Sequence, residues 1–248
     1  MDSKRAIIVG ASSGIGAEIA VELARRGYRL ALLARRRDSL RAVAARCNET
    51  AGSEVATIHV HDVCETAQVP GLYRGLVDSL GGLDLIVYAA GIIEKVGPSE
   101  FDFAKDAPVV QIGLLGAMAW LNEAARNFEE QGKGKICAIS SIAGDRGRCA
   151  YPSYHVAKAG LTTYLESLRN RLATKGVTVT TIKPGFVDTT MTKGMDGLFW
   201  VISPEKAAQT IVKHIENGAQ TKYVPARWGL VAAVIKNIPS FVFRRMKI

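Results

Sequence analysis

The sequence predicts an α/β fold built on one doubly wound parallel sheet with helices on both faces. Short runs rich in β-branched residues alternate with longer helical patterns along the 248 residues. Such alternation is typical of right-handed β–α–β units, which form parallel sheets. A glycine-rich turn directly after the first run fits the same architecture. No linker rich in Pro, Gly or Ser divides the chain, so residues 1–248 are expected to form a single domain.

The expected elements follow this alternation in chain order. Strands are predicted for the short apolar runs at 5–9, 30–33, 55–60, 85–88, 135–140, 177–182 and 222–225. Helices are predicted near 14–26, 38–51, 66–79, 100–131, 151–175 and 204–217. The last helix has a capping serine, a proline in its first turn and an acid near its N-terminus, at Ser203, Pro204 and Glu205. Ligands of such sheets bind at the carboxyl ends of the strands.

The amino-acid composition limits the kinds of molecule that the protein is expected to bind. The formal net charge is +9, which suits nucleic acid, anionic lipid or phosphorylated small molecules, or simply a solvated surface. No nucleic-acid motif is present, so no nucleic-acid partner is expected. The four cysteines lack metal-ligand spacing, so we expect reduced thiols and no metal site: Cys47, Cys64, Cys137 and Cys149. No apolar run is long enough for a signal peptide or a membrane span, which favours a cytoplasmic enzyme.

A glycine-rich turn joins the first predicted strand to the first predicted helix and has the sequence Gly10-Ala-Ser-Ser-Gly-Ile-Gly16. Glycine lets the backbone approach a pyrophosphate closely, and the free N–H groups of a helix N-terminus favour an anion. We therefore expect a Rossmann-type nucleotide site held by Gly10, Ser12, Ser13, Gly14, Ile15 and Gly16. The alternative is a plain strand-to-helix turn that binds nothing.

The end of the second predicted strand indicates which cofactor the site prefers. Sites that select NAD usually carry an acid here, which holds the ribose 2′-hydroxyl. This chain has Ala34 followed by Arg35 and Arg36. Arginine suits a 2′-phosphate through its charge and its forked hydrogen bonds, so NADP is favoured over NAD. The alternative is that these arginines belong to a solvated helix start.

Three side chains with complementary chemistry occur further along the chain. Tyr154 and Lys158 are four residues apart, so they share one face of the predicted helix. A lysine ammonium near a phenol favours the phenolate and is expected to lower its pKa, as a general acid/base requires. Ser141 follows a buried strand, where its hydroxyl can bond a carbonyl or an alkoxide. His155 points about 100° away from Tyr154 around the helix and is interpreted as a packing or surface residue.

These motifs resemble those of the short-chain dehydrogenase/reductase family, and the resemblance covers nearly the whole chain. Ser141, Tyr154 and Lys158 match the family's catalytic residues, with the same spacing from serine to tyrosine. The resemblance implies hydride transfer between the nicotinamide C4 and a carbonyl or alcohol carbon. Tyr154 would exchange the proton, Ser141 would orient the oxygen, and Lys158 would hold the nicotinamide ribose. Further cofactor contacts are implied at Asp62, Val63, Ala89, Ala90, Gly91, Tyr154, Lys158, Pro184, Gly185, Val187 and Thr189.

The chain departs from the family pattern at two places. Tyr88-Ala89 stands where the family has Asn-Asn, so hydrogen bonds of those side chains to the sheet and cofactor are expected to be missing. Gly113 stands where the family has a catalytic helix asparagine, and Gly116 where it also has glycine. The family bends this helix and holds a relay water on a backbone carbonyl there. A glycine keeps that carbonyl and eases a bend, so we expect a working enzyme with the water site retained.

Two later segments concern the substrate. The loop 190–203 contains Gly194, Gly197 and the apolar run 198–202, so we expect a substrate lid with an apolar lining, or else simple packing on the core. The tail 226–248 is apolar and ends basic. It is too short to span a bilayer, so residues 228–248 are expected to lie on an anionic membrane surface, help a lipid-linked substrate dock, or pack in an oligomer.

The tail also has a weaker similarity to the reductase subunit of bacterial polyprenyl-phosphoribose 2′-epimerases. That similarity implies reduction of a keto-sugar on a lipid phosphate, at the inner face of the membrane. The main alternative to an active reductase is an NADP-binding sensor or scaffold with little turnover, because two family positions have changed. Family analogy further implies a homodimer or homotetramer formed through the helices near 100–131 and 151–175.

Overall fold

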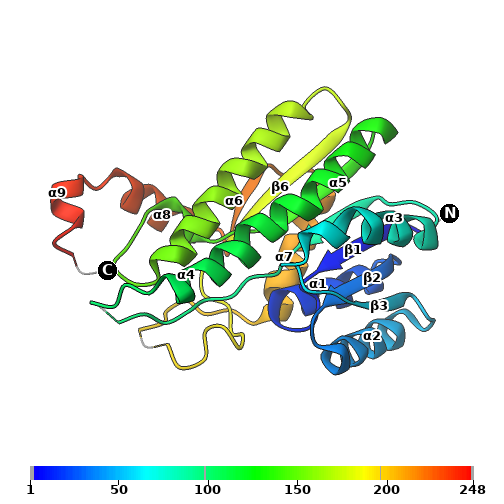
Figure 1. Ribbon diagram of the computed structural model, residues 1–248, viewed down its shortest axis with the longest axis horizontal. Coiled ribbons are helices and arrows are strands. Elements are labelled where there is room, and N and C mark those ends of the chain that lie inside the picture. The colour runs from blue at the N-terminus through cyan, green and yellow to red at the C-terminus, as the bar shows by residue number, and fades with distance from the viewer. Residues whose placement is uncertain (1–2, 98, 196, 247–248) are drawn as a thin grey trace.

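The computed structural model describes residues 3–97, 99–195 and 197–246. Within them the chain forms a parallel sheet in the order β3-β2-β1-β4-β5-β6-β7 (Figure 1). Its strands are β1 (Arg5–Val9), β2 (Arg29–Ala34), β3 (Ala56–Val60), β4 (Leu85–Tyr88), β5 (Gly134–Ile139), β6 (Val177–Pro184) and β7 (Thr221–Val224). The predicted doubly wound α/β fold is confirmed. The strand order reverses between β1 and β4, which is where ligands of such sheets bind.

The larger helices cover both faces of the sheet, because inner strands such as β1, β2 and β4 are apolar on both sides. Ile8 packs with α1 (Gly14–Arg25), α2 (Arg37–Ala51) and α7 (Pro204–Glu216). Its neighbour Ile7 points to the opposite face and packs with the second set of helices. That set comprises α3 (Val69–Leu80), α5 (Gly116–Gln131) and α6 (Pro152–Arg171). The remaining helices are α4 (Phe103–Val110), α8 (Trp228–Asn237) and α9 (Ser240–Phe243).

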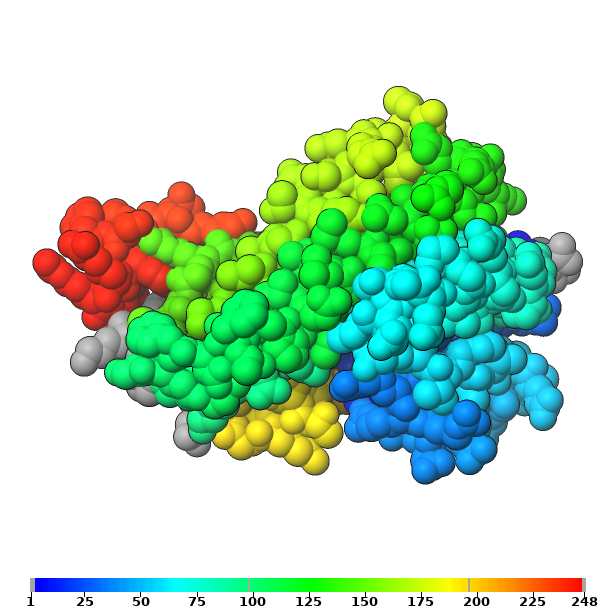
Figure 2. Space-filling model, in the orientation of Figure 1, coloured from blue at the N-terminus to red at the C-terminus, as the bar shows by residue number. Residues whose placement is uncertain are grey.

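The structure adds to the predicted elements in two segments. The stretch predicted as one helix over 100–131 is α4, a π-helical turn at Gln111–Leu115, and α5. The tail contains two short helices, α8 and α9, which we call the C-terminal arm and which extend beyond the sheet (Figures 1 and 2). Residues 247–248 of the tail and residue 196 of the substrate loop lie outside the described residues. Among the described residues, no helix is long and apolar enough to cross a membrane. The division into a single domain stays a prediction.

Candidate active site

The glycine-rich turn lies against the end of β4 at very short range. Gly10 has φ +91°, and a Cβ on it would lie 2.4 Å from the Ala90 nitrogen. A Cβ on Gly16 would lie 2.2 Å from the Gly10 carbonyl oxygen. Neither position has room for a side chain, and α1 begins directly at Gly14. The turn therefore has the close backbone packing that a pyrophosphate cradle requires, and residues 88–91 form its wall.

Two arginines directly follow β2, and each contacts other predicted cofactor residues. The Arg36 Nη2 atom donates to the hydroxyl oxygens of Ser12 and Ser13 at 3.0 and 2.7 Å. The Arg35 Nη1 atom lies 3.7 Å from the Asp62 carboxylate. The Cys64 backbone N–H and, less strongly, Arg35 hold the pKa of Asp62 below its usual value. The predicted cofactor residues from β1, β2 and β3 thus gather at one edge of the sheet.

Ser141, Tyr154 and Lys158 meet beside the carboxyl end of β5. The Ser141 Oγ atom accepts from the Ala143 backbone N–H at 3.0 Å and also hydrogen-bonds Tyr154. The Lys158 Nζ atom donates to the Ile139 carbonyl at 2.8 Å and lies 5.6 Å from the centre of the Tyr154 ring. A Cβ on Gly91 would lie 3.4 Å from that Nζ atom. The wall of the glycine-rich turn therefore also borders the lysine.

Burial controls the protonation of this group. The Lys158 side chain is only 4% exposed, and burial lowers its pKa to about 8. Burial raises the pKa of Tyr154, and the Ser141 hydrogen bond offsets part of that rise. The expected lowering of the tyrosine pKa by the lysine is therefore wrong for the protein alone. The physical reason is that loss of hydration destabilises the phenolate and the ammonium alike.

The loop after β6 completes the site. A Cβ on Gly14 would lie 3.2 Å from the Thr189 methyl carbon, so this loop lies over the glycine-rich turn. A Cβ on Gly185 would lie 2.0 Å from the Trp228 Nε1 atom, so α8 packs directly on the loop. Pro184 ends β6, and Val187 pairs with Ile202 in an isolated parallel bridge. The predicted nicotinamide-side residues thus face the predicted phosphate site.

Comparison with known proteins assigns this arrangement to a family. The family model described as short chain dehydrogenase matches residues 4–197. The chain belongs to the short-chain dehydrogenase/reductase family. An oxidoreductase of Myxococcus xanthus (strain DK1622) is 30% identical over 98% of this chain and 96% of its own. An oxidoreductase of Mycobacterium tuberculosis (strain ATCC 25618 / H37Rv) is 31% identical over 97% of this chain and 96% of its own.

Solved structures agree with this assignment. An actinorhodin polyketide ketoreductase variant, crystallised with NADPH, superposes with a TM-score of 0.81 at 26% identity and covers 90% of this chain and 96% of its own. A short-chain dehydrogenase/reductase from Mycobacterium marinum has the same fold, with a TM-score of 0.81 at 24% identity over 89% of this chain and 92% of its own. The protein is therefore an oxidoreductase of the short-chain dehydrogenase/reductase family.

At the family's Asn-Asn position this oxidoreductase has a different hydrogen bond. The buried Tyr88 hydroxyl donates to the Ile112 carbonyl in the π-helical turn at 2.6 Å. A Cβ on Gly116 would lie 2.8 Å from the Tyr88 oxygen and 3.0 Å from the Val63 carbonyl oxygen. This bond does not replace the Asn-Asn bonds to the sheet and the cofactor, whose loss stays a prediction. Tyr88 instead joins the sheet to the π-helical turn, and Gly116 makes room for its phenol.

Gly113, at the position of the family's helix asparagine, packs directly against the catalytic helix. A Cβ on Gly113 would lie 3.1 Å from the Ala157 Cβ, next to Lys158 on α6. A π-helical turn spans this residue, and such turns are a known cause of bends in helices. Glycine thus allows a closer approach of two helices than any side chain would. The relay water stays a prediction.

Replacing Gly113 by asparagine is expected to lower stability without raising the rate. The new side chain must displace Ala157, which should cost about 1–3 kcal/mol of unfolding free energy. Urea unfolding and kcat measured on the same samples test this, with Ala157→Gly added to restore part of the loss. Gly75→Asn is the matched control, because a Cβ on Gly75 of α3 meets no atom within 4 Å. A higher kcat in Gly113→Asn would show that the missing side chain limits the rate.

The substrate loop and the C-terminal arm share an aromatic cluster. Ring centres of Phe186 and Trp228 lie 5.2 Å apart, and those of Phe199 and Trp228 lie 5.0 Å apart. The ring centres of Trp200 and Trp228 lie 5.8 Å apart. Trp200 has a φ of +55°, and its backbone carbonyl accepts a hydrogen bond from the Arg227 side chain at 3.3 Å. Phe199 and Trp200 remain nearly half exposed. The sequence indicated that the loop is apolar. It did not indicate that the loop packs on Trp228 of the C-terminal arm.

Sequence reasoning missed the residues that directly follow Ser141. The segment Ser141–Arg146 contains a buried acid, Asp145, and an arginine, Arg146, that contacts the C-terminal arm. Arg148 is half-buried, and its Nε atom has no hydrogen-bond partner in the described part of the chain. The sequence does show an Asp-Arg pair in a turn that is otherwise small and apolar. The residues that contact this pair are far away in the chain, so the local sequence does not identify them.

Proposed function

We propose that this oxidoreductase is an NADP-dependent carbonyl reductase or alcohol dehydrogenase with Tyr154 as its general acid/base. The observation that supports this proposal is the meeting of the glycine-rich turn with Ser141, Tyr154 and Lys158 at one edge of the sheet. A nucleotide site and a proton-transfer group in contact are what hydride transfer to a carbonyl requires. The test is NADPH oxidation with a panel of ketones and keto-sugars.

The residues have distinct tasks in this proposal. A bound nicotinamide supplies or accepts the hydride. Tyr154 donates its hydroxyl proton to the carbonyl oxygen during reduction and takes it back during oxidation. Ser141, already hydrogen-bonded to Tyr154, orients and polarises the same oxygen. Lys158 would hold the nicotinamide ribose through its ammonium, which lies beside Gly91.

The residues present fit a dinucleotide that carries a 2′-phosphate. Gly10, Gly14 and Gly16 leave the space that the pyrophosphate needs, and the first turn of α1, from Gly14, supplies N–H groups for it. Asp62 and Val63 would contact the adenine, while Ala89, Ala90 and Gly91 would contact its ribose. The segment from Pro184 to Thr189 would hold the nicotinamide side. The NADPH-bound ketoreductase with the same fold supports the choice of NADP.

Removing Arg35 and Arg36 together is expected to weaken NADPH use selectively. In Arg35→Ser/Arg36→Ser we expect the KM for NADPH to rise about tenfold or more, because charge-assisted bonds to a phosphate are lost. The KM for NADH should change little. Arg41→Ser is the control, because Arg41 lies one turn further along α2 beside Asp38. Equal increases for both cofactors would contradict a 2′-phosphate contact.

The alternative is an NADP-binding sensor or scaffold with little turnover. The changes at Tyr88 and Gly113 support it, because both lie at family positions near the reacting groups. Its expected result is tight NADPH binding with no oxidation on the whole panel. The close contact of Ser141, Tyr154 and Lys158 favours the enzyme instead.

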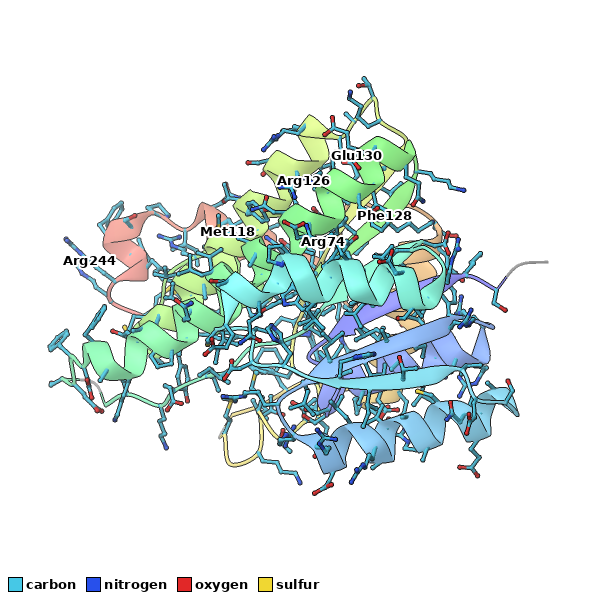
Figure 3. All side chains as sticks on the ribbon, turned by 45° about the vertical axis from the view of Figure 1, so that its right-hand side comes forward. Arg74, Met118, Arg126, Phe128, Glu130 and Arg244 are labelled. Carbon is cyan, nitrogen blue, oxygen red and sulfur yellow. The ribbon has the colours of Figure 1, made fainter. Side chains whose placement is uncertain are left out.

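A second candidate function is reduction of a keto-sugar on a polyprenyl phosphate at the inner membrane surface. Leu230, Val234 and Phe241 on the C-terminal arm are each at least 60% exposed. Residues 217–248 contain six Lys or Arg and no Asp or Glu, and Figure 3 shows Arg244 at the outer end of the arm. Exposed apolar groups beside cations favour an anionic lipid surface. Arg148, whose Nε atom has no hydrogen-bond partner among the described residues, would supply a cation for a substrate phosphate.

The arm is expected to carry the protein onto anionic vesicles. Co-sedimentation with vesicles of equal parts phosphatidylglycerol and phosphatidylcholine should fall about tenfold in Leu230→Ser/Val234→Ser/Phe241→Ser. Phe101→Ser/Phe103→Ser is the matched control, because both phenylalanines are highly exposed but lie outside the arm. Equal binding of parent and triple variant, or none by the parent, would remove the membrane proposal.

We also propose that copies of this cytoplasmic enzyme pair as a homodimer or homotetramer through the side of α4, α5 and α6. The exposed apolar side chains Leu115 and Val156 support this, because they lie on that side outside the core. Sedimentation velocity of the full chain gives the state directly. A monomer at micromolar concentration would contradict the pairing.

A further inference from the structure

The short segment Ser141–Arg146, which we call the post-serine turn, connects the catalytic group to the C-terminal arm. It contains the 3₁₀ turn Ile142–Asp145 between β5 and the loop that leads to α6. Each of its residues contacts either the catalytic helix α6 or the arm and the strands beneath it. Different residues of the turn make the contacts on the two sides.

On one side, the post-serine turn holds the catalytic residues. Ser141 accepts from the Ala143 N–H at 3.0 Å, which orients its hydroxyl. The His155 Nδ1 atom, next to Tyr154, donates to the Ala143 carbonyl at 2.6 Å. A Cβ on Gly144 would lie 2.7 Å from the Lys158 carbonyl. A shift of this turn therefore moves Ser141 relative to both Tyr154 and Lys158.

On the other side, Arg146 holds the end of the arm. Its Nη1 atom donates to the Ile235 and Ile238 carbonyls at 2.7 and 2.5 Å, where α8 ends. Its guanidinium lies 3.9 Å from the centre of the Phe243 ring in α9. Ile142 packs in one apolar cluster with Trp228 and Ala232 of α8. The arm is thus attached through both of its helices.

Asp145 joins the turn to three elements at once. Its side chain is 1% exposed and accepts from Lys183 of β6 at 2.5 Å and from the Tyr223 hydroxyl of β7 at 2.9 Å. Lys236 of α8 lies 3.2 Å from the same carboxylate. Burial alone would raise the pKa of Asp145, but the bonds with Lys183 and Tyr223 hold it below its usual value. A buried carboxylate with three donors fixes the turn firmly.

We propose that Asp145 and Arg146 are positioning residues through which the C-terminal arm sets the place of Ser141 against Tyr154 and Lys158. The inference rests on the proposed function, because it assigns these three residues to proton transfer. Catalysis depends steeply on such placement, and an error of about 1 Å can cost on the order of 100-fold in rate. The tail is therefore part of the catalytic architecture, whatever surface its outer face contacts.

The test uses the full chain with Arg146→Met and, as a second variant, Asp145→Asn. We expect kcat to fall about 10- to 100-fold while the Kd for NADPH, measured by its fluorescence, stays within about twofold. Two controls match Arg146. Arg169→Met removes an arginine that also holds backbone carbonyls, those of Val179 and Gln220, far from the turn. Arg74→Met removes an exposed arginine from α3, outside the arm and the site (Figure 3). Both should keep kcat.

A second readout needs no substrate. In protein labelled with ¹³C at the tyrosine Cζ, the Tyr154 signal, assigned with Tyr154→Phe, reports the Ser141 hydrogen bond. Arg146→Met and Asp145→Asn should shift it in the same direction as Ser141→Ala, and the two controls should not. An unshifted signal in both variants would overturn the positioning proposal. Shifted signals in a protein that reduces no ketone would instead overturn the proposed function and leave the positioning intact.

Discussion

Replacing Tyr154 by phenylalanine is expected to lower kcat by about 10²- to 10⁴-fold, the usual contribution of a positioned general acid/base. The substitution removes only the hydroxyl that hydrogen-bonds Ser141. The apolar ring and the neighbouring Lys158 stay in place, so the Kd for NADPH should change little. Stopped-flow reduction of the best ketone and fluorescence titration with NADPH measure the two quantities on one preparation.

Tyr164→Phe is the matched control for this substitution. Tyr164 lies on the same helix α6, and its hydroxyl donates to Asn122 at 2.7 Å, away from Ser141. It should keep parental turnover. Parental kcat in Tyr154→Phe would contradict the assigned role of Tyr154, because no other hydroxyl on α6 hydrogen-bonds Ser141 in the described part of the chain.

Replacing Lys158 by methionine is expected to remove most of the activity and yet stabilise the cofactor-free protein. Burial lowers the pKa of Lys158 from 10.5 to about 8, so the folded state holds its proton less tightly than the unfolded state. At pH 7 both states are protonated, and the charge lowers the unfolding free energy by roughly 3 kcal/mol. Between pH 8 and 10.5 the unfolded state binds more protons, so parental stability rises with pH and this cost disappears.

Urea unfolding at pH 7 and at pH 10 measures this signature. The advantage of Lys158→Met over the parent should be largest at pH 7 and small at pH 10. Lys175→Met is the control and should show no such advantage, since Lys175 is exposed and lies 3.4 Å from Glu129, away from the site. If Lys158→Met is less stable than the parent at pH 7, the hydrogen bond from Lys158 to the Ile139 carbonyl stabilises the protein by more than the burial of the charge destabilises it.

The architecture and the main site could be predicted because they depend on local patterns. Parallel strands buried on both faces are continuous apolar runs, as at Ile7 and Ile8. The glycine-rich turn requires Gly10 for its positive φ and Gly16 for its packing, so both appear in the sequence as fixed spacings. Tyr154 and Lys158 share a helix face through a spacing of four. Each signal lies within one turn or one element.

The features that were missed depend on residues far apart in the chain. The Tyr88 hydroxyl reaches Ile112 only because Gly116 leaves room for it, and no local periodicity connects these positions. The π-helical turn within 100–131 is likewise fixed by packing against other elements. The post-serine turn depends on contacts of Arg146 with the C-terminal arm. The rise in the Tyr154 pKa comes from burial, which the sequence does not quantify.

The most direct test of the proposed reaction is the fate of the hydrogen at C4 of NADPH. The protein is incubated with NADPH deuterated at both C4 positions and with the ketone that it reduces fastest, and the product is examined by mass spectrometry and NMR. We expect the product alcohol to carry one deuterium on its carbinol carbon, with one NADP⁺ formed for each alcohol. NADPH that binds tightly while every ketone on the panel stays unreduced, or an alcohol without the label, would contradict the account.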